Sequence, residues 1–335
     1  MYKNINLQLF ANPNTQTTTT PGLSNAMKTY YNSELLENAG PNLVHYQFGK
    51  KVKVPQRRGK TIEWRKWNSL GKALTPLEEG VTPDATAMSV DIVVAYLYQY
   101  GAYTTISDFL DMTAIDDVIV EAANKHGESA GLTIDTITRN AIHSDVTQFL
   151  YAFTDTVKPV SRVNLTANCI VTPKVIAKAV AMLKKKNTPK IKGKYIAIIH
   201  PSVEFDLETS EDWIDVHKYA ATTEIFEGEI GEIYGVRCVV TSEAKIWKGT
   251  GTEPNGLAVY GTLVFGKDAY GVVDLEGGGL EMIIKQKGSG GTADPLEQRS
   301  TVGWKVSGYS AKVLLPEYIV RIESCSAFST EDEAN

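Results

Sequence analysis

Hydrophobic and polar residues alternate along two stretches in the first third of the chain, and this alternation predicts strands. In TIEWRKW, residues 61–67, Ile62 and Trp64 fall on one face and the charged side chains between them on the other. In MSVDIVVAYLYQYGAYTTI, residues 88–106, tyrosines repeat with the same period. Between the two lies NSLGKALTPLEEGVTPDATA. A structureless loop of that length is uncommon inside a compact domain, so we expect a projecting two-stranded arm that rests on a second surface.

A period of 3.6 residues follows and predicts the strongest helix of the chain, over residues 108–142. Ser107 or Asp108 can cap its N-terminus. At 1.5 Å per residue, such a helix is about 50 Å long, which suits a structural spine. Gly127 and Gly131 each cost ~1 kcal/mol relative to alanine and can bend or break it. The apolar stripe of the helix consists of Ile115, Val118, Ile119, Ala122, Ala130, Ile134, Ile137 and Ala141.

The pattern then becomes mixed α/β. NCIVTPKVIAKAVAMLKKKN reads as a strand feeding a helix, with Thr172 as N-cap and Pro173 at the favoured first position. KYIAIIHP is predicted as a buried strand and SVEFDLETSEDWIDV as a second helix. Further strands are predicted in GVRCVVTSEA, GLAVYGTLVFGKDAYGVVDL, LEMIIKQKG and WKVSGYSAKVLLPEYIVRIES, the last with Pro316 at an edge or bend.

The two ends of the chain read differently from its body. Residues 1–22 are polar and rich in Thr, which is typical of an extended or disordered arm. SNAMKTYYNSELLENAG predicts a short helix, with Ser24 as N-cap and Gly40-Pro41 as its stop. TEDEAN, at the other end, reads as a solvated acidic tail.

Charge is distributed unevenly along the chain. The net charge is −5 over 335 residues, which argues against a protein that lives on a polyanion. Residues 1–72 hold 11 Lys/Arg and 3 Asp/Glu, a net of +8, and the remaining 23 Lys/Arg and 36 Asp/Glu give −13. A basic front and an acidic body make copies of the chain complementary to one another, which is a first hint of self-assembly.

Composition narrows the class of protein. The length favours about two domains, and 43% hydrophobic residues suffice for a sizeable core. The longest apolar run is far shorter than the roughly 20 residues of a membrane helix, and no signal peptide is recognisable. Cys169, Cys238 and Cys325 are too few and too scattered for a disulfide framework, so we expect buried free thiols in a reducing cytoplasm.

The residues that could carry chemistry form no convergent motif. The five histidines have no metal spacing, and the Gly-rich segments 276–281 and 288–294 lack the Lys-Ser/Thr of a phosphate loop. His200 follows a strand, where α/β enzymes place catalytic groups, and a Cys–His pair with Cys169 or Cys238 stays open. A structural histidine is the preferred interpretation. We therefore predict no enzymatic activity, no cofactor and no metal, and a hydrolase around His200 ranks last among the alternatives.

The order of these parts resembles the major capsid proteins of tailed bacteriophages, with the Hong Kong 97-type fold. LTPLEEGVTPD followed by YQYGAYTTISDFLD is similar to that family's projecting loop returning into its spine helix. NCIVTPKVIAKAVAML, IIHPSVEFDLETSEDW and FEGEIGEIYGVRCVVTSEA resemble its central α/β region, and DPLEQRSTVGWKVSGYSAKVLLPEYIVRIE its closing strands. The pattern is most similar to the subgroup named after coliphage N-four. The chain has no long charged helical N-terminal extension that would act as a built-in scaffold.

The resemblance implies an α+β fold with an N-terminal arm, a projecting β-hairpin, a long spine helix with a β-sheet, and a central α/β domain. The expected division is 1–48, N-terminal arm and short helix; 49–105, projecting loop; 106–146, spine helix of the peripheral domain; 147–275, axial α/β domain; 276–329, closing strands of the peripheral domain; 330–335, acidic tail. It also implies self-assembly into hexamers and pentamers of an icosahedral shell around double-stranded DNA. Because no built-in scaffold is recognisable, the shell is expected either to use a separate scaffolding protein or to assemble without one. A portal and decoration proteins are further implied partners, and no membrane is implied. The expected place is the virion, after assembly in the host cytoplasm.

The basic stretch GKKVKVPQRRGKTIEWRKW, residues 49–67, then has two interpretations. Its eight Lys/Arg interleaved with tryptophans are typical of a nucleic-acid groove. In the family, the matching loop lies over neighbouring subunits, and arginine suits pairing with the carboxylates of an acidic body. We therefore predict an inter-subunit interface made by Lys53, Arg57, Arg58, Lys60, Trp64, Arg65, Lys66, Trp67, Glu78 and Glu79. The alternatives are an encapsulin-like compartment shell and a DNA-binding protein that uses residues 49–67.

Overall fold

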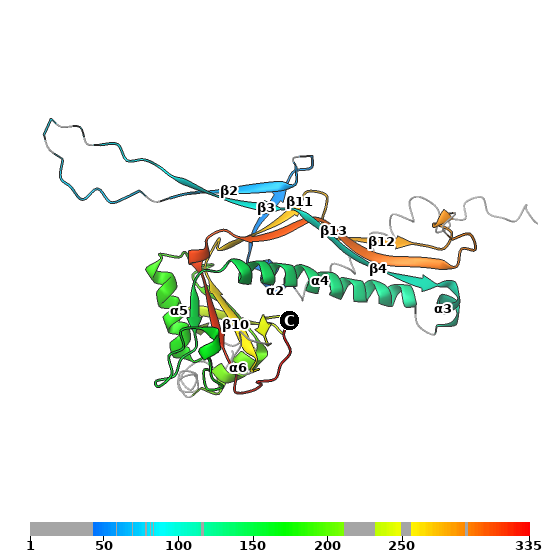
Figure 1. Ribbon diagram of the computed structural model, residues 1–335. Coiled ribbons are helices and arrows are strands. Elements are labelled where there is room, and N and C mark those ends of the chain that lie inside the picture. The colour runs from blue at the N-terminus through cyan, green and yellow to red at the C-terminus, as the bar shows by residue number, and fades with distance from the viewer. Residues whose placement is uncertain are drawn as a thin grey trace, which may run out of the picture. The chain divides into compact units, whose positions relative to one another are not determined.

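The computed structural model describes most of the chain after its first 42 residues. The described ranges are 43–57, 59–68, 70–77, 79–80, 82, 84–114, 117–210, 232–248, 256–291 and 294–335. They belong to two units. Unit 1 contains Gly101–Gly131 and Leu280–Val306, and unit 2 contains Leu43–Tyr100, Leu132–Gly279 and Ser307–Asn335. Figure 1 shows the elements in chain order. The predicted helix after Ser24 and the polar arm lie outside the described residues.

The core of unit 2 is a seven-stranded mixed sheet. Its order is β5-β14-β10-β6-β8-β7, with β9 paired to β10. The strands are β5 (Phe149–Tyr151), β6 (Tyr195–Ile199), β7 (Glu232–Ile233), β8 (Val236–Val240), β9 (Ile246–Trp247), β10 (Val259–Phe265) and β14 (Ile319–Ser324). Every residue of β6 and β10 is buried. Strands buried on both faces read as continuous apolar runs, which is the pattern of these two segments.

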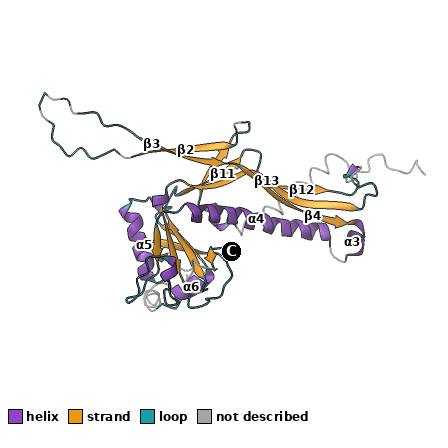
Figure 2. Ribbon diagram, in the orientation of Figure 1, coloured by secondary structure: helices purple, strands orange, loops and turns teal. Residues whose placement is uncertain are grey.

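Two helices complete this core. α5 (Pro173–Lys185) begins after Thr172 with proline at its first position, and buries Val175, Ile176 and Leu183 in the same apolar cluster as the sheet. α6 (Pro201–Glu208) adds Val203 and Leu207 to that cluster. Figure 2 shows both helices beside the strands. The predicted strand before α5 is wrong, because the fully described residues 168–172 contain no strand.

A second set of strands in unit 2 carries the segment from residue 43 onwards. After α2 (Val44–Gln47), β1 (Lys50–Val54) pairs in parallel with β11 (Tyr270–Leu275). β11 in turn pairs with the last residues of β13 (Arg299–Val313). The region between β13 and β14 contains the 3₁₀ helix η6 (Pro316–Tyr318), so the predicted bend at Pro316 is confirmed.

A separate two-stranded sheet is formed by β2 (Thr61–Trp67) and β3 (Val90–Tyr96). β2 is the strand that the alternation predicts. The returning strand is not continuous: β3 ends before Leu97, whose N–H donates to the Lys60 carbonyl at 2.9 Å, and β4 (Tyr98–Ser107) begins after it. β4 pairs with β13 instead of β2. The predicted single strand is therefore two strands in two sheets.

Unit 1 combines strands with the start of the long helix. Here β12 (Glu281–Lys285) pairs antiparallel with the first part of β13. The sheet and β4 approach closely at Gly303, where an added Cβ would lie 2.6 Å from the Tyr103 Cβ, so only glycine fits. α3 (Asp108–Thr113) follows β4, and its first turn is capped by the Ser107 hydroxyl, which accepts from Leu110 N–H at 3.2 Å.

The predicted helix over residues 108–142 is two helices. α4 (Val118–Asp145) has 28 residues and contributes to both units. The break falls before it, where Ala114 has an extended backbone and the Asp117 carboxylate accepts from Ile119 N–H at 3.1 Å as a new cap. Of the bend or break expected at Gly127 and Gly131, the break is wrong, because both residues lie inside α4. Ser107 and Asp117 each cap a helix start, so a new helix begins at Val118. The cost of the two glycines, ~1 kcal/mol each, does not end it.

The acidic tail is exposed at Glu331 and Glu333, as predicted, but Asp332 is half-buried and bound by its own chain. Asp332 accepts hydrogen bonds from the Tyr260 hydroxyl at 2.6 Å and the Ser329 hydroxyl at 2.6 Å. Ala258 N–H donates to the Thr330 carbonyl at 2.9 Å. The hydroxyls of Tyr260 and Ser329 thus bind the Asp332 carboxylate, which the composition of the tail predicts to be solvated.

Candidate assembly interface

The two faces of the β2–β3 hairpin differ in what covers them. The register pairs Thr61 with Tyr96 and Trp67 with Val90. Residues opposite each other in an antiparallel pair share a face, so each face draws alternate residues from both strands. Exposure alternates along β2 as exposed, half-buried, exposed to its end. The alternation that the sequence predicts is confirmed.

The inner face of the hairpin packs on its own chain. The Trp64 ring lies over Gly271, where an added Cβ would be 3.0 Å from the ring. Lys66 Nζ lies 2.5 Å from Glu317 Oε1, and the Glu317 carbonyl accepts from Gln148 Nε2 at 2.6 Å. On β3, Ala95 is only 3% exposed. These contacts fix the root of the hairpin on unit 2.

The outer face is left open by a single copy of the chain. Trp67, Ile92 and Tyr96 expose 62%, 57% and 58% of their surface. Arg65 lies opposite Ile92 on the same face, and its only ion pair within the described part of the chain is a 3.8 Å contact to Glu63. An exposed patch of large apolar side chains beside an arginine is the composition found at the centres of protein interfaces.

The loop between β2 and β3 is open as well. Its described residues between 70 and 89 are all exposed and contain no helix or strand, as the trace between β2 and β3 in Figure 1 shows. Leu74, Leu77 and Met88 expose 82%, 76% and 64% of their surface. No described residue covers these apolar side chains, so the loop has the features of a segment that a second molecule completes.

The basic turn between β1 and β2 presents its charges to solvent. Lys53, Arg57 and Lys60 are exposed, and none of the three forms an ion pair with a described residue. Arg57 has a φ of 62°, in the left-handed region that a non-glycine residue seldom adopts, and Gly59 follows with a φ of 94°. Arg57 and Lys60 in the turn and Lys53 in β1 thus lie near one end of the hairpin without an ion-pair partner among the described residues.

The predicted interface residues separate into three groups. Lys53, Arg57, Lys60, Arg65, Trp67 and Glu79 are exposed. Trp64 and Lys66 are on the inner face, with partners in their own chain. Arg58 and Glu78 lie outside the described residues. The structure thus gathers Arg65 and Trp67 on one open surface and assigns Trp64 and Lys66 to holding the hairpin root. Contact of any of them with a neighbouring copy stays a prediction.

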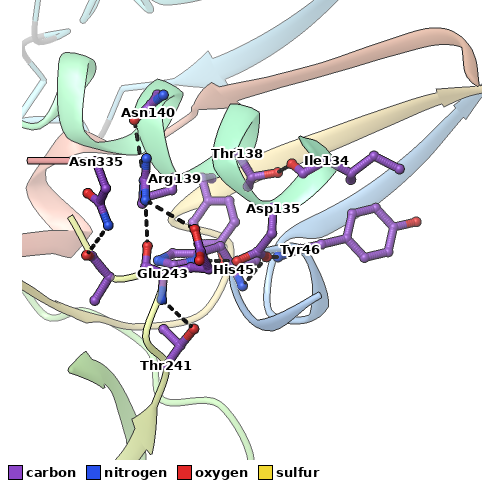
Figure 3. Close-up of polar contacts among 12 residues, drawn as sticks. His45, Tyr46, Ile134, Asp135, Thr138, Arg139, Asn140, Thr241, Glu243 and Asn335 are labelled. Atoms are coloured by element: carbon purple, nitrogen blue, oxygen red, sulfur yellow. Dashed lines mark hydrogen bonds and ion pairs between the residues drawn. The ribbon is translucent and has the colours of Figure 1, made fainter. Parts of the chain in front are cut away.

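A buried ionic clamp that sequence reasoning missed joins α2 to α4 (Figure 3). His45 Nδ1 lies 2.6 Å from Asp135 Oδ2, and both residues are fully buried. The other oxygen of Asp135 accepts from the backbone N–H groups of His45 at 2.6 Å and Tyr46 at 3.1 Å. The carboxylate therefore caps α2 and pairs with its histidine at once, which fixes the backbone just after residue 42 on the long helix.

Further polar contacts surround this clamp. The Tyr270 hydroxyl donates to the His45 carbonyl at 2.5 Å. Arg139, one turn along α4 from Asp135, is 1% exposed and donates from Nη1 to the Glu243 carbonyl at 2.7 Å. Burial lowers the pKa of Arg139, while nearby Glu243 and Asp135 raise it. The only available signal in the sequence was a carboxylate next to the apolar stripe of a helix.

The residues considered for catalysis have structural partners. The His200 side chain accepts from Ser202 N–H at 3.2 Å and caps α6. Burial lowers the pKa of His200, and nearby Asp332 raises it. Cys169, Cys238 and Cys325 are buried free thiols, as expected. Among the described residues, no group of three His, Cys, Asp or Glu side chains could hold a metal ion, and no helix is long and apolar enough to cross a membrane.

A family model and several solved structures are similar to this chain. A family model described as phage capsid protein matches residues 91–322. The capsid of the cyanophage P-SCSP1u is similar in structure, with 17% sequence identity and a TM-score of 0.63 over 85% of this chain and 89% of that one. The capsid of Ralstonia phage GP4 gives 12% identity and a TM-score of 0.64 over 86% and 89%. No curated protein matches the sequence.

A compartment protein is also similar. The SrpI encapsulin complex from Synechococcus elongatus gives 10% identity and a TM-score of 0.56, over 90% of this chain and 93% of that one. At such identities the likeness concerns the fold alone. That fold is the Hong Kong 97-type fold.

The family match decides between these relatives, because it spans well over half of the 335 residues. The chain belongs to the phage capsid protein family, and its role is that of a major capsid protein, a structural component of the virion shell.

Proposed function

We propose that copies of this chain associate into hexamers and pentamers through their β2–β3 hairpins, and that these capsomers close into an icosahedral shell around double-stranded DNA. The contacts are heterologous, since the open face of one copy meets a different surface on the next, and such contacts close into rings. The process is association without a reaction, so the proposal assigns no catalytic role to any residue.

The observation that carries this proposal is the open outer face of the hairpin. Trp67, Ile92 and Tyr96 are more than half exposed beside Arg65. Apolar surface of this kind gains about 25 cal/mol per Å² when a partner removes it from water. The basic turn at Lys53, Arg57 and Lys60 adds cations that suit an acidic neighbour, and the chain after residue 72 is net acidic. Single exposed ion pairs add about 0.2–1 kcal/mol, which selects geometry and lets misplaced copies dissociate.

The finer features of the resemblance belong to the same proposal. We place the chain in the capsid subgroup named after coliphage N-four, with assembly in the cytoplasm of the bacterial host. Its further partners are a separate scaffolding protein, a portal and decoration proteins. The shell encloses its DNA without sequence-specific binding, since a net charge of −5 does not favour a wall that grips a polyanion.

An encapsulin-like compartment is the second candidate, since the SrpI encapsulin complex has a similar fold. It predicts shells that hold a protein cargo and no DNA. A DNA-binding protein that uses residues 49–67 is the third candidate. It predicts an affinity for duplex DNA that falls steeply with salt and collapses when Arg57, Arg58 and Lys60 are neutralised.

Light scattering on the purified protein, with negative-stain micrographs of the same fractions, tests the proposal. Shells, or rings of five and six copies, are the expected result. A monomer that stays monomeric with its scaffolding partner added, and that binds duplex DNA tightly at physiological salt, would contradict it. Shells purified from cells with an enzyme inside and without DNA would favour the compartment.

A further inference from the structure

Exposed lysines gather at one end of unit 2, where α5 ends and the chain turns back into β6. Lys184 and Lys185 lie in the last turn of α5, and a second turn, between β10 and β11, adds one more lysine. All of these lysines are exposed, and none forms an ion pair with a described residue. This lysine cluster consists of Lys184, Lys185, Lys186, Lys190, Lys192 and Lys267.

Backbone hydrogen bonds bring the two turns together. After α5, Thr188 N–H donates to the Leu183 carbonyl at 3.1 Å, which folds the chain back on the end of the helix. Lys267 N–H in the second turn donates to the Pro189 carbonyl at 2.9 Å. The two turns therefore form one surface, and its lysines come from segments that are far apart in the sequence.

Few carboxylates balance the charge of this surface. Residues 156–203 contain ten Lys/Arg and no Asp or Glu, and Asp268 is the one carboxylate within the two turns. Six lysines and one carboxylate give a local charge of +5. Asp91 and Glu317 line a cleft together with Lys186, but Glu317 already forms an ion pair of its own. The net charge of −5 for the whole chain does not oppose a local contact, because charges further away than about 8 Å are largely screened at physiological salt.

The composition of the lysine cluster suits a polyanion better than a protein partner. No large apolar side chain is exposed within residues 184–194 or 266–269, whereas the outer face of the hairpin exposes Trp67, Ile92 and Tyr96. Protein interfaces are enriched in aromatic residues and arginine and depleted in lysine. Lysine instead contacts phosphate as a compact point charge. Bases are read mostly by bidentate side chains such as arginine, and the two turns contain no arginine.

We propose that the lysine cluster binds the phosphate backbone of double-stranded DNA without reading its sequence, and that the α5 end of unit 2 faces the inside of the shell. This inference rests on the proposed function, to which it adds a contact surface and a direction. Phosphate contacts of this kind weaken steeply as salt rises, because binding releases condensed counterions. They also let DNA slide along the wall while it is packed and released.

The affinity of unassembled chains for duplex DNA tests the cluster directly. The variant Lys184→Gln/Lys185→Gln/Lys190→Gln/Lys192→Gln removes four charges at exposed positions, so its fold should be retained. It should bind a short random-sequence duplex at least roughly tenfold more weakly than the wild type at about 50 mM salt. The slope of log affinity against log salt concentration should become shallower by about 3–4, because each lost phosphate contact removes about one. Fluorescence anisotropy over a salt series measures both.

A matched control removes the same charge from other surfaces. It is the variant Lys50→Gln/Lys51→Gln/Lys285→Gln/Lys305→Gln, in which all four lysines are exposed. This control should keep the wild-type affinity and slope. A control that loses as much affinity as the cluster variant, or a cluster variant that binds like the wild type, would overturn the inference.

Chemical modification of intact particles tests the direction and separates the inference from the proposed function. Mature particles are treated with a small amine-reactive reagent while they hold DNA and again after its release, and mass spectrometry identifies the modified lysines. The lysine cluster should react several-fold more slowly while DNA is present, whereas Lys285 should react alike in both states. Equal reactivity of the cluster, or protection that persists without DNA, as an acidic partner protein would give, overturns the inference and leaves the shell intact. A chain that forms no particles would contradict the proposed function, and the anisotropy measurement would still test the cluster.

Discussion

The central sheet of unit 2 and the β2–β3 hairpin are parts of one chain that differ in how far a single copy completes them. Every residue of β6 and β10 is buried, and α5 and α6 add their apolar faces to the same cluster. On the hairpin, described residues of the same chain cover only the face that carries Trp64, while Trp67 on the other face stays 62% exposed. Burial within one copy therefore accounts for the sheet, whereas the outer face of the hairpin has the composition of a surface for association.

The comparison predicts that substitutions in the sheet act on folding. Phe265 is fully buried and lies 5.4 Å from the Tyr270 ring and 6.1 Å from the Phe48 ring. Phe265→Ala should lower the free energy of unfolding by about 3–5 kcal/mol, because it removes apolar contacts and leaves a cavity. Denaturant unfolding of unassembled chains measures this. A loss below 1 kcal/mol would mean that the sheet is not the stable part of the molecule.

The buried clamp on α4 should behave like the sheet, although its residues are polar. Asp135→Asn keeps the shape of the side chain and replaces one of the two oxygens that contact His45 and Tyr46. We expect a loss of about 3 kcal/mol in unfolding free energy, since a buried hydrogen-bonding group then loses its partner. The double variant His45→Phe/Asp135→Leu should recover part of it. Equal losses for the single and double variants would contradict a coupled pair.

The buried histidines should also make the free energy of unfolding depend on pH. Burial, followed by nearby Arg321, lowers the pKa of His143 well below its ordinary value. Because the unfolded chain takes up the proton first, stability is full above the unfolded pKa of 6.5 and is lost as pH falls below it. The unfolded pKa limits the loss from this residue between pH 7 and pH 5 to about 2 kcal/mol. His126 and His200, whose pKa values burial also lowers, add in the same direction.

Unfolding by denaturant at several pH values tests this effect. His143→Gln should flatten the fall between pH 7 and pH 5, and His217→Gln, outside the described residues, serves as a histidine variant for comparison. An unchanged slope in His143→Gln would show that the buried ring does not govern the acid sensitivity.

The smallest effect is expected at the root of the hairpin. Lys66 and Glu317 are both 37% exposed at the side chain, so their 2.5 Å ion pair is partly screened by water. Lys66→Ala should cost about 0.2–1 kcal/mol in unfolding free energy. A double-variant cycle with Glu317→Ala measures the coupling. A coupling above 2 kcal/mol would mean that the hairpin root is locked more firmly than a surface ion pair allows.

The periodicity of the sequence predicted those elements that are determined by residues close to one another along the chain. The alternation in residues 61–67 gave the right faces for Ile62 and Trp64 because the period of two is a local property of a strand. It did not reveal that β3 ends before Leu97. That boundary depends on distant strands, because residues 90–96 pair with β2 and residues 98–107 pair with β13. The helix break before Val118 was missed for a similar reason, since Asp117 acts as a cap only once Ala114 is extended.

The site was predictable only in part. Arg65 and Trp67 were predicted from charge and aromatic content, and the structure leaves both open. Trp64 belonged to the same prediction, yet its ring lies over Gly271, more than two hundred residues further along the chain. His45 and Asp135 are 90 residues apart, so no local spacing could join them. Contacts between segments distant in sequence therefore decide which side chains of residues 49–67 stay exposed and available to a partner.

The assembly threshold of Trp67→Ala, measured by light scattering together with the unfolding of the same chain, tests whether the open face of the hairpin serves association. The threshold should rise roughly tenfold, as expected for a large aromatic side chain in an interface. The unfolding free energy should stay within about 0.5 kcal/mol of the wild type, because an exposed side chain contributes little to folding. Wild-type assembly by this variant, or a chain that unfolds instead, would contradict a role of this face in association.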